Sequence, residues 1–592
     1  MPKRFHQQLI GDIVRRRVAV HPSRTALVWR DLEMSYLELD GVVDQVATGF
    51  RLLGVKSGDR VALLLHNTRE FVFCYYALAR LGVVVVPLNV LYSPEEVAFL
   101  LESSGAVGVV TVPRYYERTL QKIRERLPLQ WLVVISGEEA QPRNTTSWQD
   151  LTKEILPDPV RVPLDTTDPI LLAYTAGANG LPKGVVHSHV SLLMAGQMLQ
   201  DVSQVNWRSD ISVEEEQESL QLSEGPFEVV LLPMPLFNVF NLNIGLNFSL
   251  RMGATVVLQE NFDPTTTLSV LWSRQCSLLY GSPQIFEMLV THPTFRDYDW
   301  KASNLRHAFC GGGYGRLPLW VWQEWQRGTG LPIHEHYGTV ETGGVLLSTT
   351  NAISGLRPVK PPTVGRPLPM TRVELRDLQG LAVPPGSLGQ IVCQGPNLML
   401  GYYEAADQSY RPLEGQLLAT GDMAYSDADG NFYIVDRWTE IIYTDQGLVF
   451  PLEIEAILRE NPEVKEAAVL GVQVRKTMPV SQPNVPGASP PTQVETWQLP
   501  VAFVVLRDGV PQQLDAEYRT TNMLRQYVRE TLENQGRPES NSTVIESKVP
   551  RMVFYREHLE KLPNGMVLKR AMREEAQLEF ARRWESAARA AQ

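Results

Sequence analysis

The chain has 592 residues, a formal net charge of −11, 44% hydrophobic residues and 20% charged residues. This length predicts several domain-sized units with extensive cores, and the composition is typical of globular proteins. The acidic balance argues against a nucleic-acid partner, because such partners normally require a basic surface.

No targeting, membrane-spanning or metal-binding pattern stands out. The N-terminal residues MPKRFHQQLIGDIVRRR lack the apolar stretch of a secretory signal, and the most apolar passage, ALARLGVVVVPLNV, is too short to span a bilayer. We therefore expect no transmembrane segment and a cytoplasmic location. Nothing in the sequence indicates an oligomeric state. The four widely spaced cysteines predict buried thiols rather than a zinc site; they are Cys74, Cys276, Cys310 and Cys393.

Strand-like and helix-like segments alternate in the first part of the chain. Residues 60–67 predict a buried strand, residues 68–82 an amphipathic helix and residues 83–89 a second strand. Ser93, followed three residues later by Glu96, has the pattern of a capping box at a helix start. This alternation predicts βαβ units and a parallel sheet covered by helices.

The rest of the chain divides into two regions that differ in their pattern of predicted strands, turns and helices. Short strands with Gly/Pro turns predict a small β-rich subdomain at about 364–436, and the mixed pattern of 437–592 predicts an α+β domain. We therefore predict an α/β fold with a large N-terminal domain, residues 1–436, of parallel and mixed βαβ sheets that includes this subdomain. A small mobile α+β C-terminal domain, residues 437–592, would follow. Four further buried strands are expected in the large domain, at 227–235, 255–260, 276–283 and 305–312.

Two segments have the composition of insertions. Residues 212–226 are acidic and predict a solvated loop or surface helix. Residues 478–500, in the C-terminal domain, are rich in proline and predict an extended, mobile excursion.

The segment LLAYTAGANGLPKGVVHSH, residues 171–189, places glycines and a Pro-Lys-Gly after a strand-like run. Alone it is a weak signal, since a glycine-rich turn after a strand is more often structural than phosphate-binding. It lacks the Gly-Lys-Ser/Thr of a Walker loop. The glycines of GGGYG, residues 311–315, do not have the dinucleotide-binding spacing, because the last position of that pattern is Arg316.

The order of several motifs is far more specific than any one of them. YTAGANGLPKG is followed by PMPLFNVFNLNIG, LRHAFCGGGYGRLP, HYGTVETGG, TVGRPLP, LATGDMAYSDADGNFYIVDR, VFPLEIEAIL and LEKLPNGMVLKRAMR. From about residue 8 to 575 this series resembles the adenylate-forming (AMP-binding) superfamily, and most of all its fatty acyl-CoA synthetase branch. The resemblance implies a large domain that binds ATP and a carboxylic acid. A small domain would rotate over it, first for acyl-adenylate formation and then for attack by a thiol, usually coenzyme A.

The resemblance also implies a nucleotide site. Asp422 would accept hydrogen bonds from the ribose hydroxyls, Arg437 would lie near the ribose at the domain hinge, and Tyr337 would stack on adenine. Glu341 would bind Mg²⁺ and so act in catalysis. The other nucleotide-binding positions would be Thr175, Gly177, Gly180, Lys183, Gly312, Gly313, Tyr314, Glu335, Gly338 and Thr339.

The acyl pocket and the thiol tunnel are expected by the same resemblance. The pocket would lie beside Asn238, Phe240, Phe309 and Gly311, and its apolar lining suggests an aliphatic or aromatic acid. Gln446 stands where the family usually has glycine in the loop that lines the thiol tunnel. Its larger side chain would narrow that tunnel.

Several positions depart from the family's pattern, and they lie on one reaction path. Ala176 and Ala178 replace hydroxyl residues of the phosphate loop, and Val340 replaces a threonine that contacts the α-phosphate. Met566 occupies the position of the adenylation lysine, whose ammonium bridges carboxylate and phosphate oxygens in the transition state. Losing one such donor costs on the order of 10²–10³ in rate. Lys569, one helical turn or less away, is a candidate substitute.

Three functions stay open. The first is an acid–CoA ligase that handles a carboxylic acid, ATP/AMP, Mg²⁺ and coenzyme A, with strongly impaired adenylation. The second is ATP-independent acyltransfer of a ready-made acyl thioester between coenzyme A and a carrier protein. The third is a non-catalytic protein that acts as a binding partner or senses nucleotide. The sequence does not identify the acid.

Overall fold

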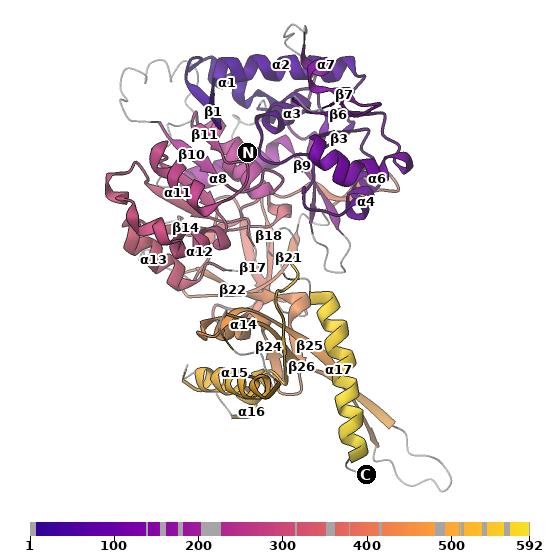
Figure 1. Cartoon of the computed structure of the whole chain (residues 1–592), viewed down its shortest axis with the longest axis vertical. Coiled ribbons are helices and arrows are strands. Elements are labelled where there is room, and N and C mark those ends of the chain that lie inside the picture. The colour runs from indigo at the N-terminus through magenta and orange to yellow at the C-terminus, as the bar shows by residue number, and fades with distance from the viewer. Residues whose placement is uncertain are drawn as a thin grey trace. The chain divides into compact units, whose positions relative to one another are not determined.

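The computed structural model describes residues 8–137, 140–153, 162–175, 182–202, 227–313, 316–350, 362–377, 379–413, 417–479, 492–507, 510, 514–534, 542–561, 567 and 569–590. The chain forms two compact units (Figure 1). Unit 1 comprises residues 1–387, 391–420 and 426–433, and unit 2 comprises residues 388–390, 421–425 and 434–592. None of the described helices combines the length and the apolar character that crossing a membrane requires.

Two mixed sheets of nine strands form the framework of unit 1. The first has the order β16-β15-β14-β13-β12-β10-β11-β1-β2, and its neighbours from β14 to β1 are parallel. Its strands are β1 (Thr25–Trp29), β2 (Leu32–Ser35), β10 (Val229–Leu232), β11 (Thr255–Leu258), β12 (Leu278–Gly281), β13 (His307–Cys310), β14 (Ile333–Tyr337), β15 (Leu347–Ser348) and β16 (Arg366–Pro367).

The second sheet has the order β20-β19-β9-β8-β4-β3-β5-β6-β7. It is parallel from β8 to β7 and antiparallel from β8 to β20. Its strands are β3 (Arg60–Leu64), β4 (Val84–Pro87), β5 (Gly108–Thr111), β6 (Trp131–Val134), β7 (Thr146–Ser147), β8 (Pro169–Thr175), β9 (Lys183–Ser188), β19 (Gly401–Glu404) and β20 (Ser409–Pro412).

Helices cover these sheets, and one apolar core joins residues of both, among them Leu27, Val61, Tyr75 and Val230. The longer helices of unit 1 are α1 (Ile13–Val18), α2 (Tyr36–Leu52), α3 (Arg69–Arg80), α4 (Pro94–Ser104), α8 (His189–Val202), α11 (Pro264–Ser273), α12 (Pro283–Thr291) and α13 (Leu319–Thr329). Other helical segments are η2 (Ile10–Asp12), α5 (Pro113–Tyr115), α6 (Gln121–Ile123), α7 (Trp148–Thr152), the π-helix η5 (Phe240–Phe248), α10 (Ser249–Arg251) and η8 (Val340–Thr342). The predicted α/β fold with parallel and mixed sheets is confirmed.

Local signals placed several of these elements correctly. Thr68 precedes α3, and its hydroxyl accepts a hydrogen bond from the amide of Phe71. Ser93 and Glu96 form the predicted capping box at the start of α4. The four cysteines are free and buried, as predicted, and burial raises the pKa of the Cys74 thiol well above its ordinary value.

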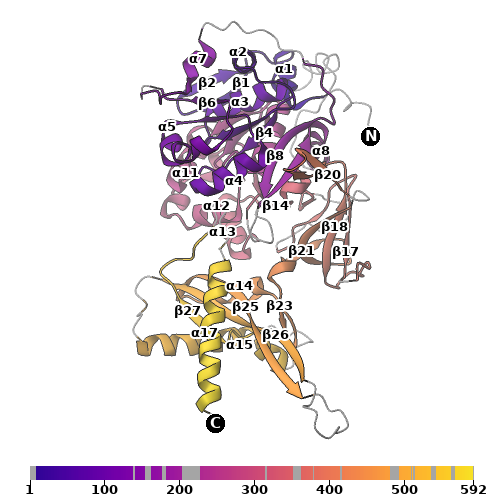
Figure 2. The same ribbon diagram turned by 90° about the vertical axis from the view of Figure 1, so that its right-hand side faces the viewer.

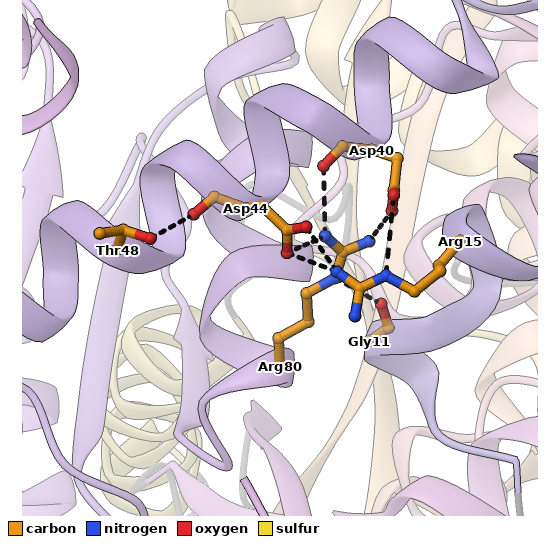
Figure 3. Close-up of polar contacts among 6 residues, drawn as sticks. All are labelled: Gly11, Arg15, Asp40, Asp44, Thr48 and Arg80. Atoms are coloured by element: carbon orange, nitrogen blue, oxygen red, sulfur yellow. Dashed lines mark hydrogen bonds and ion pairs between the residues drawn. The ribbon is translucent and has the colours of Figure 1, made fainter. Parts of the chain in front are cut away.

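A buried network of charges joins the first helices of the chain (Figure 3). Arg80 donates from Nε to the carbonyl of Gly11 over 3.0 Å and from Nη1 to Oδ1 of Asp44 over 2.6 Å, and it also pairs with Asp40. Arg15 bonds both carboxylate oxygens of Asp44, at 2.5 and 2.6 Å. Arg80 is 4% exposed and Asp44 is 5% exposed. These contacts connect η2 and α1 to α2 and α3.

A four-stranded sheet has the order β17-β18-β21-β22; its strands are β17 (Arg372–Arg376), β18 (Gly389–Gln394), β21 (Leu418–Ser426) and β22 (Phe432–Arg437). Unit 2 mixes helices and strands, and α17 contacts β25 (Figure 2). Its other elements are β23 (Ile442–Thr444), β24 (Gly447–Val449), α14 (Pro451–Glu460), β25 (Val464–Pro479), β26 (Thr492–Leu506), α15 (Leu514–Asn534), α16 (Ser542–Lys548), β27 (Met552–Tyr555) and α17 (Lys569–Ala590).

The prediction of an extended, mobile excursion at residues 478–500 needs one correction, because residues 478–479 and 492–500 belong to paired strands. Residues 464–479 and 492–506 form a long antiparallel hairpin, in which Gly471 opposes Pro500. Pro500 lacks an N–H, and its carbonyl accepts a hydrogen bond from the amide of Arg551 over 2.7 Å. Residues 480–491 and the acidic segment 212–226 lie outside the described residues.

Candidate nucleotide and acyl site

The predicted phosphate loop closes a β-hairpin in unit 1. Thr175 is the last residue of β8, Lys183 is the first residue of β9, and the two are cross-strand partners. The Lys183 ammonium lies 5.1 Å from the centre of the Tyr402 ring, which β19 supplies from the other side of β9. Ala176, Gly177, Ala178 and Gly180 lie outside the described residues.

The segment 337–341 leads from β14 into the short helix η8. Tyr337 ends the strand, and the amide of Thr339 donates to the hydroxyl of Thr342 over 2.9 Å. At Gly338 a Cβ would meet the carbonyl oxygen of Gly344 at 2.5 Å, so only glycine fits this close approach. The backbone is therefore fixed directly before the carboxylate of Glu341.

Glu341 is held by its side chain and by its backbone. The Tyr402 hydroxyl donates to Oε1 over 3.1 Å, and the carbonyl of Glu341 accepts from the amide of Met399 over 2.8 Å. Burial, followed by the charge of Glu341, raises the pKa of Tyr402 well above its ordinary value, so the phenol remains a donor near neutral pH. Through this bond Tyr402 orients the carboxylate.

His187 supports the same segment from β9. Its Nε2 donates to the carbonyl of Val340 over 2.6 Å, because a carbonyl can only accept, and its Nδ1 lies 3.0 Å from the Ser191 hydroxyl. The ring is fully buried, and burial lowers its pKa to about 4. A neutral imidazole with its proton on Nε2 thus anchors the carbonyl next to Glu341.

The glycines after β13 leave space for the side chain of Phe240. A Cβ at Gly311 would meet the Phe240 ring at 2.7 Å, and one at Gly312 would meet both Phe240 and the side chain of Asn238. Asn238 fixes this arrangement, because it donates to the carbonyl of Gly312 over 2.7 Å and accepts from the amide of Phe240 over 2.9 Å. A Cβ at Gly313 would meet Pro283 and Ser282 at 2.7 Å. Tyr314 lies outside the described residues.

Glu335 is a buried acid in β14. Its Oε1 accepts from the amide of Leu317 over 3.4 Å, and Oε2 has no hydrogen-bond partner among the described residues. Burial raises its pKa to about 8, while the bond from Leu317 acts in the opposite direction. This side chain is therefore mainly protonated at neutral pH in the folded protein.

The substitution Glu335→Gln is expected to flatten the dependence of stability on pH. The folded-state pKa of about 8 lies above the ordinary value of 4.5, so the stability of the parent chain falls as pH rises through this interval. The neutral amide cannot ionise, and the melting temperature of the variant should exceed that of the parent at pH 8 but not at pH 4.5. Thermal unfolding across this range is the measurement, with exposed Glu102→Gln as the control. Parallel melting curves for parent and variant would contradict the prediction.

Unit 2 contains a second group of predicted residues. Asp422, in β21, pairs with Arg437, the last residue of β22, with Oδ1 and Nε 3.2 Å apart. The neighbouring Asp436 accepts hydrogen bonds from the amides of Arg437 and Leu452, both at 2.8 Å, and burial raises its pKa to about 6. Gln446 lies exposed in the turn between β23 and β24.

Lys569, the candidate substitute for the missing lysine, is already engaged. Its Nζ donates to Oε1 of Glu455 over 2.7 Å, and the lysine is only 8% exposed. The same carboxylate oxygen accepts from the amide of Val469 over 2.9 Å. Met566 lies outside the described residues.

A magnesium ion fits the donor chemistry at Glu341. Mg²⁺ is usually bound through one or two carboxylates together with substrate phosphates and water. Glu341 would hold the ion through its carboxylate, which the bond from Tyr402 orients. The described residues contain no cluster of three or more acidic, histidine or cysteine side chains that would form an all-protein cage.

Three further residues lie beside the predicted ones and were not expected from the sequence. His187 and Tyr402 hold the segment 340–341, and His336, in β14, lies with its ring centre 5.1 Å from that of Phe309. His187 lies four residues after Lys183, so this one could have been noticed as an unusual polar residue in a buried strand. No local pattern marks the other two.

The comparisons with known proteins agree with this arrangement of motifs. The family of AMP-binding enzymes matches residues 14–403. Feruloyl-CoA synthase from Amycolatopsis sp is 30% identical, over 79% of this chain and 86% of that protein. Long-chain-fatty-acid–CoA ligase from Bacillus subtilis (strain 168) is 27% identical, over 97% of this chain and 95% of that protein. The crystal structure of an anthranilate CoA ligase in complex with anthranoyl-AMP has a TM-score of 0.78 at 23% identity, over 97% of this chain and 98% of that one, a likeness that concerns the fold.

Proposed function

Because the chain belongs to the AMP-binding enzyme family and, within it, to the acyl-CoA ligases of the adenylate-forming type, we propose that it binds ATP and a carboxylic acid but adenylates the acid slowly. Ligases of this type use ATP, Mg²⁺ and coenzyme A. The relatives named above act on fatty and on aryl acids, and none of their names refers to a carrier protein. The acid–CoA ligase is therefore the function we favour over carrier-protein acyltransfer.

The observation that carries this proposal is the Lys569–Glu455 pair. Met566 stands where an ammonium would bridge the acid and the α-phosphate, and Lys569 is the nearest cation after it in the sequence. To act instead, Lys569 would have to leave a carboxylate that is itself 6% exposed. Breaking a buried pair in this way costs about 3–5 kcal/mol. Lys569 is therefore held in a buried ion pair and is not available as the catalytic cation.

Nucleotide binding is better supported than catalysis. Glu341 has the orientation described above, and the Asp422–Arg437 pair has a carboxylate that suits ribose hydroxyls. When bound, Mg²⁺ would offset the phosphate charge. His187, Tyr402 and the amide of Met399 would keep Glu341 in place without further rearrangement. Val340 takes part in this network only through its backbone carbonyl, because its side chain has no hydrogen-bond donor.

The test is acid-dependent ATP–pyrophosphate exchange by the full-length protein, across fatty and aryl acids. We expect exchange near background, together with measurable binding of MgATP by calorimetry. A Glu341→Gln variant should weaken the magnesium dependence of that binding. Brisk exchange with any acid would contradict the proposed impairment, and absence of nucleotide binding would contradict the nucleotide site itself.

A further inference from the structure

His336 is buried, and neither nitrogen of its ring has a hydrogen-bond partner among the described residues. It is 4% exposed. Leaving a buried polar atom unpaired is costly, and native proteins rarely do so without a functional reason. Two such atoms on one side chain are therefore available to bond a ligand or an ordered water.

The surroundings of His336 are aromatic. In three adjacent parallel strands, Tyr280, Phe309 and His334 are in register, and their side chains form one row across the sheet. The ring centres of Tyr280 and Phe309 are 5.3 Å apart, and those of Phe309 and His334 are 5.7 Å apart. His336 follows His334 on the same face of β14, because alternate residues of a strand share a face.

Phe240 closes the other side of this group. Its ring centre is 6.2 Å from that of His336 and 6.0 Å from that of Tyr280. It can lie there because Gly311 has no Cβ, as described above. Aromatic side chains such as these contact a further planar ring in offset or edge-to-face geometry, which a saturated chain cannot adopt.

The imidazole is neutral in this setting. Burial, followed by the charge of His334, lowers the pKa of His336 to about 3. A neutral imidazole carries one donor and one acceptor, and neither is committed to the protein. It can therefore bond a hydroxyl or an amino group through either tautomer, whereas it offers no counter-charge to an ionised group.

We propose that the acyl group taken by this chain is an aromatic ring that carries a hydroxyl or amino substituent, and that His336 selects this substituent. This inference rests on the proposed function, since it concerns the acid of the same site. His336 would act in binding specificity and not in the transfer of the adenylate.

Stable acyl-adenylate analogues test the inference without any turnover. The probes are acyl-sulfamoyl adenosines of benzoic acid, of its 2-, 3- and 4-hydroxy isomers, of cinnamic and 4-hydroxycinnamic acids, and of decanoic acid. Their dissociation constants are measured by calorimetry with the full-length chain. We expect at least one hydroxyaryl analogue to bind roughly tenfold more tightly than its unsubstituted parent, the value of one satisfied hydrogen bond to a buried group. The decanoyl analogue should bind more weakly than either.

Two variants separate a selecting role from a packing role. His336→Phe should lose the hydroxyl preference yet melt at the same or a higher temperature than the parent without ligand, because the replaced nitrogens bond nothing in the protein. His336→Gln, which keeps a donor and an acceptor, should retain part of the preference. A preference that persists in His336→Phe, or tightest binding by decanoyl or unsubstituted aryl analogues, would overturn the inference. Failure of every analogue to bind would instead contradict the proposed nucleotide site.

Discussion

Replacing Met566 with lysine, together with Ala176→Ser, is expected to raise acid-dependent ATP–pyrophosphate exchange by about 10²-fold, the worth of one preorganised donor to a developing charge. The lysine supplies an ammonium that the thioether lacks, and the serine returns a hydroxyl donor to the phosphate loop. The serine alone should contribute less, because its hydroxyl bonds phosphate in the ground state as well as in the transition state, and such uniform binding does not raise the rate at saturating MgATP. Exchange at saturating MgATP, with and without acid, is the measurement.

The matched control for this pair is Met566→Leu with Ala176→Ser, which changes the same positions and adds no cation. It should remain near the parent rate. Met566→Lys should also bring single-turnover AMP formation above the parent without a large change in MgATP affinity, because the ammonium acts mainly in the transition state. If the lysine and leucine variants exchange pyrophosphate equally, position 566 does not limit adenylation, and the impairment has another origin.

The fold was predictable where the signals are local. Thr68 and Ser93 mark helix starts through side chains three residues from their partners, and buried β-branched runs such as residues 60–64 predict strands without reference to the rest of the chain. The β25–β26 hairpin was not predicted, because its pairing depends on strands meeting across a proline-rich segment. Composition alone cannot distinguish a solvated excursion from a long hairpin with an extended backbone.

In the candidate site, only the residues that belong to the motifs were predictable from the sequence. Their order located Glu341, Asp422 and Arg437, but the groups that hold them come from elsewhere in the sequence. Tyr402 is 61 residues from Glu341, and His187 is 153 residues from Val340. Such contacts depend on strand order, here β19 beside β9, which no single motif encodes.

The ion pair of Lys569 shows that sequence spacing alone also fails to identify a catalytic residue. By sequence spacing it is a natural replacement for the cation absent at 566. In unit 2 it instead neutralises Glu455, which also accepts the amide of Val469 in β25. A cation that satisfies a buried carboxylate is structural, so the nearest lysine in sequence is a poor guide to the catalytic one.

Arg80→Met should destabilise unit 1 by about 3–5 kcal/mol, which is the usual cost of removing one partner from a buried ion pair. The Arg80 side chain is 1% exposed, and its loss removes a buried donor from the carbonyl of Gly11 and from the carboxylate of Asp44. Methionine keeps much of the side-chain volume, so the loss reports charge more than packing. The urea midpoint of unfolding, followed with hydrogen exchange in η2, α1 and α2, measures the effect.

The control is Arg15→Met, which removes a second cation from the same carboxylate. Arg15 is 30% exposed, so water can replace part of its interaction and its loss should cost less than that of Arg80. Arg80→Met combined with Asp44→Leu should be less destabilising than the sum of the two single changes, because the double variant leaves no charge at 44 to be satisfied. Equal losses for Arg80→Met and Arg15→Met, or additive effects in the double variant, would show that the network contributes through packing alone. In that case the burial of these charges would not explain how η2 and α1 are joined to α2 and α3.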